Sequence, residues 1–149
     1  MDIDIKFCSD PNAFNCKQAG KIPMMIFGSA ALDVDAIDIS SLRLCLASNT
    51  AVCTASGPQS WTYFDRGDPT SDLGTDACAF DDVADQDGFD DLDVAFDSKE
   101  VVALIECGGL ANGEASPTLV ITGMTFGGLS IFSEPIGDVG IDQLMIKNK

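Results

Sequence analysis

Hydrophobic and polar residues alternate over several short stretches of this chain, which is the pattern of β-strands with one buried face. Residues 2–7 alternate strictly, and residues 41–46 place their leucines on one side of a strand. The run 22–27 is apolar throughout, and Pro23 near its start favours an edge position or a strand start. Further strands are predicted at 61–64, 92–96, 118–122, 129–132 and 141–146.

The turns between these stretches indicate how the strands connect. Gly127 and Gly128 separate two of the predicted strands and indicate a hairpin. Residues 98–105 carry apolar positions at helical spacing after Ser98, a candidate N-cap, so we expect one short helix there. About eight short strands with Gly, Asp and Pro turns favour an all-β fold, an antiparallel β-sandwich of Ig-like or jelly-roll-like type. The length of 149 residues suits a single domain over 1–149.

Composition narrows the class of protein. A hydrophobic content of 46% argues against disorder despite a net charge of −16. That charge disfavours nucleic acid and anionic membranes as partners, and no apolar run is long enough for membrane insertion. Histidine is absent, which removes the usual general base and the Ser-His and Cys-His nucleophile pairs. We therefore do not expect an enzyme, although a carboxylate pair drawn from Asp97, Glu100 and Glu106 could in principle act as in glycosidases.

The strongest chemical signal is an aspartate-rich stretch over 81–92. Asp85 and Asp87 are two residues apart, Gly88 allows a sharp turn, and Asp91 follows three residues later. This spacing lets hard oxygen ligands converge, as in calcium loops, so we expect Ca²⁺ here. The alternative is a solvated acidic turn. A second acidic group, Asp33, Asp35 and Asp38, could bind another ion or lie on the outer face of a short strand.

The six cysteines are even in number, which favours disulfides and an extracellular location. Spacing suggests the pairs Cys8–Cys16, Cys45–Cys53 and Cys78–Cys107, although fifteen pairings are formally possible. A zinc site is the rival interpretation, but the chain has no Cys-x-x-Cys and no histidine to complete it. No signal peptide is recognisable, so we expect a mature form.

Two groups of apolar residues have both a packing and a binding interpretation. Trp61 and Tyr63 could stack on a sugar, although a single tryptophan in a β-sandwich more often belongs to the core. Met24 and Met25 are expected to pack in the core or at an edge, because no histidine or cysteine accompanies them at the spacing of a copper site.

The opening of the chain resembles a family of secreted bacterial and archaeal domains. That family typically reads D-I-K-P-G-S-D-P-N-S-I-N and then K-G-K-I-P-V-A-I-L-G, and the matching positions here are Asp4–Lys6, Ser9–Asn12, Asn15, Gly20–Pro23, Ile26 and Gly28. The similarity continues through residues 34–44 and the aspartate loop to Phe96. The resemblance implies an extracellular module of a kind often attached to larger surface proteins, in a family to which no enzymatic activity is assigned.

The chain also departs from the family pattern. Phe7 and Cys8 stand where the family has Pro-Gly. The comparison therefore suggests that Cys8 and Cys16 form an additional disulfide within this loop. In the family's D-x-N-x-D-G-x-x-D-L loop, Val83 occupies the first ligand position, where Asp81 or Asp82 could substitute only through a backbone shift. The predicted metal ligands are Asp82, Asp85, Asp87, Phe89 and Asp91.

Together these features predict a secreted, calcium-binding structural or adhesive module. Self-association into a fibre or tube is one form of this hypothesis, and contact with other cell-surface proteins is another. A carbohydrate-binding module is the alternative function.

Overall fold

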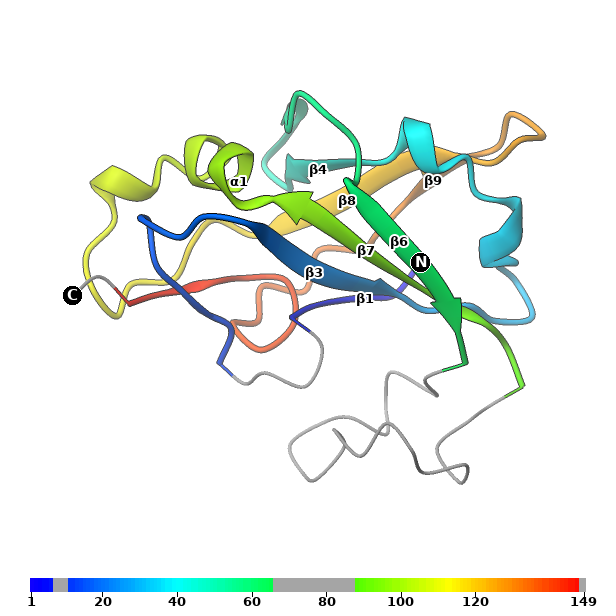
Figure 1. Ribbon diagram of the computed structural model, residues 1–149, viewed down its shortest axis with the longest axis horizontal. Helices are drawn as coiled ribbons and strands as arrows, with labels where there is room; N and C mark the ends of the chain where they lie inside the picture. Colours follow the sequence, from blue (N-terminus) through cyan, green and yellow to red (C-terminus); the bar gives the residue numbers. More distant parts are fainter. Residues whose placement is uncertain (7–10, 66–87, 148–149) are drawn as a thin grey trace.

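The computed structural model describes residues 1–6, 11–65 and 88–147 (Figure 1). Its strands form two four-stranded antiparallel sheets. The first sheet has the order β1-β3-β7-β6, from Ile3–Ile5, Lys21–Ile26, Asp91–Asp97 and Ser60–Phe64. The second has the order β5-β4-β8-β9, from Asn49–Cys53, Arg43–Leu46, Leu119–Met124 and Ser130–Phe132. The all-β, antiparallel prediction is confirmed; an Ig-like or jelly-roll-like sandwich remains a prediction.

Both sheets contribute to one buried core, because alternate residues of each strand point the same way. In the first sheet, β3 and β7 pair Ile22 with Phe96 and Met24 with Val94, and all four side chains are buried. In the second sheet, Leu44 of β4 lies opposite Ile121 of β8, again buried. Met24 therefore packs in the core as expected, whereas Met25 is buried on the opposite side of the sheet.

The predicted helix is present as α1 (Ser98–Leu104), directly after β7. Its N-cap is Asp97, one residue earlier than expected, because the Asp97 carboxylate accepts the Lys99 N–H at 2.8 Å. Val101 and Leu104 bury one face of the helix. Short 3-10 turns occur at η1 (Val34–Ala36), η2 (Ile39–Ser41) and η5 (Cys107–Gly109).

Residues 141–146 differ from the prediction of a single strand over this whole range. Only Met145–Ile146 form a strand, β10, and it runs parallel to β2 (Ala13–Phe14). The residues around β10 nevertheless form backbone hydrogen bonds with two other segments, one at Ser116 and one at Asn12. The Ser116 N–H donates to the Leu144 carbonyl at 2.7 Å, and the Met145 N–H donates to the Asn12 carbonyl at 2.8 Å. With β1 paired to β3, both ends of the described chain are therefore held within the molecule.

One predicted disulfide is confirmed and two pairings are wrong. Cys45 and Cys53 lie opposite one another on β4 and β5 and are bonded. Cys16 is bonded to Cys107, 91 residues away, and not to Cys8. Because Cys107 is bonded to Cys16, it cannot form the predicted bond with Cys78. Cys8 and Cys78 themselves lie outside the described residues. Sequence spacing could not identify this pair, because the fold brings the segment after β2 next to η5, which begins at Cys107.

Candidate functional site

The aspartate-rich segment leaves the first sheet after β6 and returns to it at β7. At its base, the Asp65 carboxylate accepts the backbone N–H of Gly88 at 2.9 Å. Gly88 has φ +88, so the turn expected at this glycine is present. Phe89 is partly exposed beside it. The predicted ligands Asp82, Asp85 and Asp87 lie outside the described residues, so their arrangement stays a prediction.

Asp91, the last predicted ligand, is the first residue of β7 and is fully buried. Its Oδ1 accepts the Gly28 N–H at 2.8 Å. A Cβ on residue 28 would lie 1.9 Å from the Asp90 carbonyl oxygen, so only glycine permits this approach. Asp91 therefore has a structural role at the exit of the loop, alongside its predicted role as a metal ligand.

Further carboxylates lie on the side of the first sheet that faces away from the core. Asp4, Met25, Asp93 and Thr62 are register neighbours across β1, β3, β7 and β6. Met25 is buried in this row, whereas Thr62 is exposed. Among residues 1–6, 11–65 and 88–147, no three carboxylate or cysteine side chains converge closely enough to hold a metal ion.

The second acidic group forms helix caps and not the outer face of a strand. The Asp33 carboxylate accepts the Asp35 N–H at 3.0 Å and begins η1, while the Asp38 carboxylate accepts the Ser40 N–H at 3.1 Å and begins η2. Capping accounts for two of these aspartates without an ion.

The carboxylates considered for glycosidase chemistry also have structural partners. Glu100 accepts the Ser56 N–H at 3.1 Å, and Asp97 caps α1 and accepts the Gln59 side-chain amide at 3.2 Å. Glu106 is exposed at the turn before η5. These contacts give Asp97 and Glu100 a role in the fold.

Trp61 is 52% exposed, which overturns the expectation that the only tryptophan packs in the core. Its partner on β7 is the buried Val94, so the Trp61 side chain is on the core side of the sheet, but β6 is an edge strand and leaves this side chain uncovered. Tyr63, two residues further, packs partly against the core. Burial, and then the nearby Asp35 carboxylate, raise the pKa of Tyr63. The two aromatic side chains share one side of β6.

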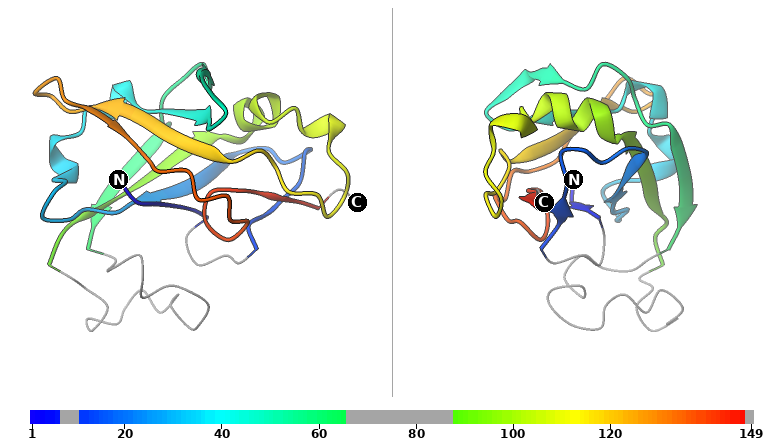
Figure 2. Two further views of the ribbon diagram at one scale, coloured as in Figure 1. Left: turned by 180° about the vertical axis from the view of Figure 1, so that it is seen from behind. Right: turned by 60° about the vertical axis from the view of Figure 1, so that its left-hand side comes forward.

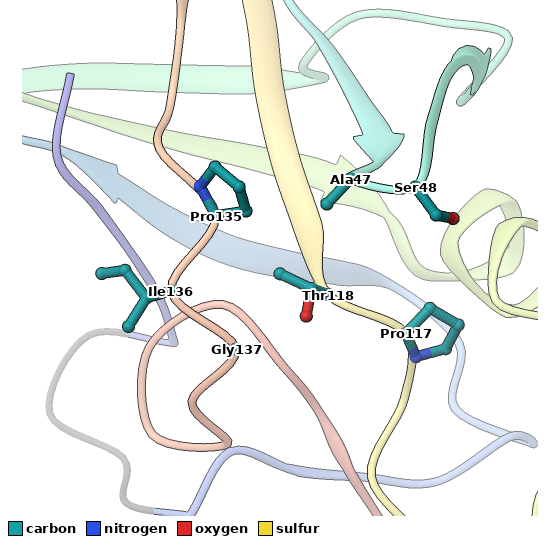
Figure 3. A pocket seen from close by; sticks show the side chains of 7 residues that line it. All are labelled: Ala47, Ser48, Pro117, Thr118, Pro135, Ile136 and Gly137. Carbon is teal, nitrogen blue, oxygen red and sulfur yellow. The ribbon is translucent and has the colours of Figure 1, made fainter.

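A groove of about 450 Å³ lies beside the start of β8 (Figure 3). Pro135 and Ile136 are on one side, and Ala47 and Ser48 on the other. Pro117, Thr118 and Gly137 complete the lining, so none of its residues is charged. The loop on the Ile136 side is held by the buried Asp142 carboxylate, which accepts N–H groups from residues 136, 137 and 138 at 2.7, 3.0 and 2.9 Å.

The β8–β9 hairpin carries an exposed apolar surface that sequence reasoning missed. We define the hairpin patch as Met124, Phe126, Leu129 and Phe132, all of them exposed. Phe126 is the most exposed, at 74%. The available signal was the stretch 115–133, which has no charged residue in a chain of net charge −16.

Comparison with protein-family models, with curated proteins and with solved structures found no match to this chain.

Proposed function

We propose that this protein is an extracellular structural or adhesive module whose fold is stabilised by Ca²⁺ bound in the 81–92 loop. The observation that carries the proposal is the pair of hydrogen bonds at the base of that loop. Asp65 and Asp91 hold backbone N–H groups at the two points where the segment leaves and rejoins the sheet. A cation bound between such anchored ends would stiffen the connection between β6 and β7.

The concentration of negative charge in the loop is the reason to expect a bound cation. Residues 81–91 contain the aspartates Asp81, Asp82, Asp85, Asp87, Asp90 and Asp91 and no lysine or arginine. Carboxylates crowded in this way repel one another unless a counter-charge is present. Ca²⁺ suits them because it takes oxygen ligands in flexible geometry.

The disulfides support an extracellular location. The bonds Cys16–Cys107 and Cys45–Cys53 would persist in an oxidising compartment and are rare in a reducing cytosol. No helix in the described part of the chain is long and apolar enough to cross a membrane.

A structural role fits the carboxylates better than hydrolysis does. The glycosidase candidates Asp97 and Glu100 accept backbone hydrogen bonds, and the chain has no histidine. Self-association is the form of this role that we favour. Donation of the N-terminal strand to a neighbour is not required for it, because β1 already pairs with β3 in the same chain.

Calorimetric calcium titration of the oxidised protein tests the loop directly. We expect binding with a stoichiometry of at least one ion, and its loss in the double variant Asp85→Asn/Asp87→Asn. The matched control Asp2→Asn/Glu134→Gln removes the same charge from exposed positions and should bind as the wild type does. Equal binding by both double variants would show that the loop is not the site.

A carbohydrate-binding module is the second candidate, supported by the exposure of Trp61 beside Tyr63 on an edge strand. Flat aromatic rings bind the apolar faces of sugars, and the Asp35 carboxylate near Tyr63 could accept hydroxyl groups. Glycan-array retention that is lost in Trp61→Ala but kept in Phe64→Ala would support this function. If the wild type is retained on none of the glycans, the carbohydrate-binding function is wrong.

A further inference from the structure

We propose that the hairpin patch binds a basic segment of another protein, in which apolar side chains lie next to lysine or arginine residues. The proposal names the class of partner for the adhesive role above and rests on that role, but it does not depend on calcium. Two observations carry it together. The hairpin exposes apolar side chains, and carboxylates lie beside them.

The hairpin patch has the character of a docking element. Phe126 and Leu129, at the turn, are 74% and 67% exposed, and Phe132 on β9 is 60% exposed. Met124 and Phe132 are diagonal neighbours across β8 and β9, on the side of the sheet away from the buried Ile131. Apolar side chains gathered on one exposed element mark interaction sites more often than singly scattered ones do.

The hairpin backbone is fixed to the segment that contains η1 and η2. The Phe126 N–H donates to the carbonyl of Ala36, the last residue of η1, at 2.9 Å. The Asp38 N–H donates to the Met124 carbonyl, also at 2.9 Å. Little conformational freedom would therefore be lost when a partner docks, which favours affinity.

These hydrogen bonds also bring carboxylates to the hairpin. Asp38 is bonded to it directly, and Asp33 and Asp35, both exposed, belong to η1 and its cap. On the other strand, the exposed Glu134 follows Phe132 by two residues. We call Asp33, Asp35, Asp38 and Glu134 the acidic rim of the hairpin patch.

Basic residues of the described chain lie away from the hairpin tip. Lys21 starts β3 opposite the N-cap of α1, and Lys99 lies within α1, whereas Figures 1 and 2 show the hairpin tip projecting at the end opposite α1. In the strands of the second sheet the basic residue is Arg43, whose guanidinium donates to the Ser40 and Leu42 carbonyls at 2.8 and 2.7 Å. The other described lysines adjoin β2 or the residues after it, namely Lys6, Lys17 and Lys147.

Charge complementarity selects the partner. A second copy or another acidic protein would bring further carboxylates to the acidic rim and be repelled there. A lysine or arginine side chain instead covers apolar surface with its aliphatic stem, while its charged group pairs with a carboxylate such as Asp35. The cationic group can also lie on the face of an aromatic ring, which Phe126 and Phe132 offer.

Fluorescence anisotropy of a labelled peptide tests the proposal, with the oxidised full chain in about 0.15 M salt, where the Debye length is about 8 Å. The probe is a short peptide of alternating arginine and leucine. One comparison peptide has glutamate in place of arginine, and another has serine in place of leucine. Phosphatidylcholine vesicles test whether the patch instead enters a membrane.

Two variants separate the apolar and the charged contributions. The tip variant is Phe126→Ser/Leu129→Ser, and its control, Val52→Ser/Ile136→Ser, removes exposed apolar side chains elsewhere. The rim variant is Asp33→Asn/Asp35→Asn, in which asparagine can still cap η1. Its control, Asp2→Asn/Glu106→Gln, removes the same charge from other exposed positions.

We expect the arginine-leucine peptide to bind best, with its dissociation constant raised about 10-fold or more in the tip variant and about threefold in the rim variant. Both controls should bind as the wild type does. Equal binding by the wild type and the tip variant would overturn the proposal, because attraction would then come from the acidic surface in general. Binding of the glutamate peptide as tightly as the arginine peptide would overturn it too, and so would binding of the vesicles but of no peptide.

Repeating the titration in EDTA separates this proposal from the calcium proposal. Peptide affinity should be the same in calcium and in EDTA, because the acidic rim and the hairpin patch lie outside the 81–92 loop. The calcium shift in melting temperature should be unchanged in the tip variant. Failure of the peptide to bind, with that shift intact, would remove the basic partner and leave the calcium-stabilised module.

Discussion

The backbone N–H of Gly28 donates to the buried carboxylate of Asp91 at 2.8 Å, and this bond ties the end of β3 to the start of β7. It lies where the aspartate-rich loop enters the sheet. The carboxylate therefore contributes to the fold at the same place where we propose that the metal acts. Local stability and calcium binding should be coupled through this residue.

Gly28→Ala should be strongly destabilising. The new Cβ would lie 1.9 Å from the Asp90 carbonyl oxygen, and backbone atoms would have to move. We expect a loss of at least about 3 kcal/mol in the free energy of unfolding, measured by urea denaturation. Gly109→Ala is the control, because a Cβ there meets nothing within 4 Å. Similar losses in both variants would contradict the close approach.

Substitutions at Asp91 separate its two roles. Asp91→Ala removes the acceptor for the buried Gly28 N–H and should cost about 1–3 kcal/mol without calcium. Asp91→Asn keeps a carbonyl oxygen in the same place and should cost less, yet it should weaken calcium binding as a loop variant does. An Asp91→Asn protein that binds calcium normally would limit this residue to its structural role.

The two disulfides should differ in their effect on stability. In the chain-entropy description, Cys16–Cys107 closes a long loop and contributes about 4.5 kcal/mol, whereas the short Cys45–Cys53 loop contributes about 2.5 kcal/mol. The serine pairs Cys16→Ser/Cys107→Ser and Cys45→Ser/Cys53→Ser can be compared by thermal unfolding. Peptide mapping without reductant provides the check, since a Cys8–Cys16 peptide would contradict the long-range bond.

Tyr63 is the only tyrosine, so ultraviolet titration reports on it alone. Its pKa is raised by burial and then by the Asp35 carboxylate, and Asp35→Asn should lower it part of the way to the ordinary value. Because the folded state holds this proton more tightly than the unfolded state, stability should fall as the pH rises from the ordinary tyrosine pKa of about 10 through the raised one. An unchanged titration in Asp35→Asn would exclude the electrostatic contribution.

Trp61 is the only tryptophan and should fluoresce like an exposed indole. Iodide should reach it less readily than a neutral quencher, because the protein surface is strongly acidic. A blue-shifted emission that resists neutral quenchers would show that the side chain is buried in solution, which would also remove the platform for a glycan.

The sequence predicted the local features of this fold well. The alternation around Leu44 and the hairpin at Gly127 and Gly128 depend on neighbours in the chain, and the structure contains the corresponding strands. The bond from Cys16 to Cys107 and the exposure of Trp61 depend on how distant segments meet, which spacing and composition do not encode.

The candidate site was only partly predictable for the same reason. The turn at Gly88 follows from residue type, because glycine adopts positive φ without strain. The bond between Asp91 and Gly28 joins residues 63 positions apart and requires the β3–β7 register. The hairpin patch is also a consequence of topology, because β9 is an edge strand.

Thermal unfolding of the oxidised protein in calcium, in magnesium and in EDTA tests the central claim most directly. Calcium at about 100 times its dissociation constant should add about 2.7 kcal/mol to stability and raise the melting temperature by about 5–10 °C. Magnesium should have a much smaller effect, because it demands rigid octahedral geometry and dehydrates reluctantly. Equal melting temperatures in calcium and EDTA would contradict a calcium-stabilised fold.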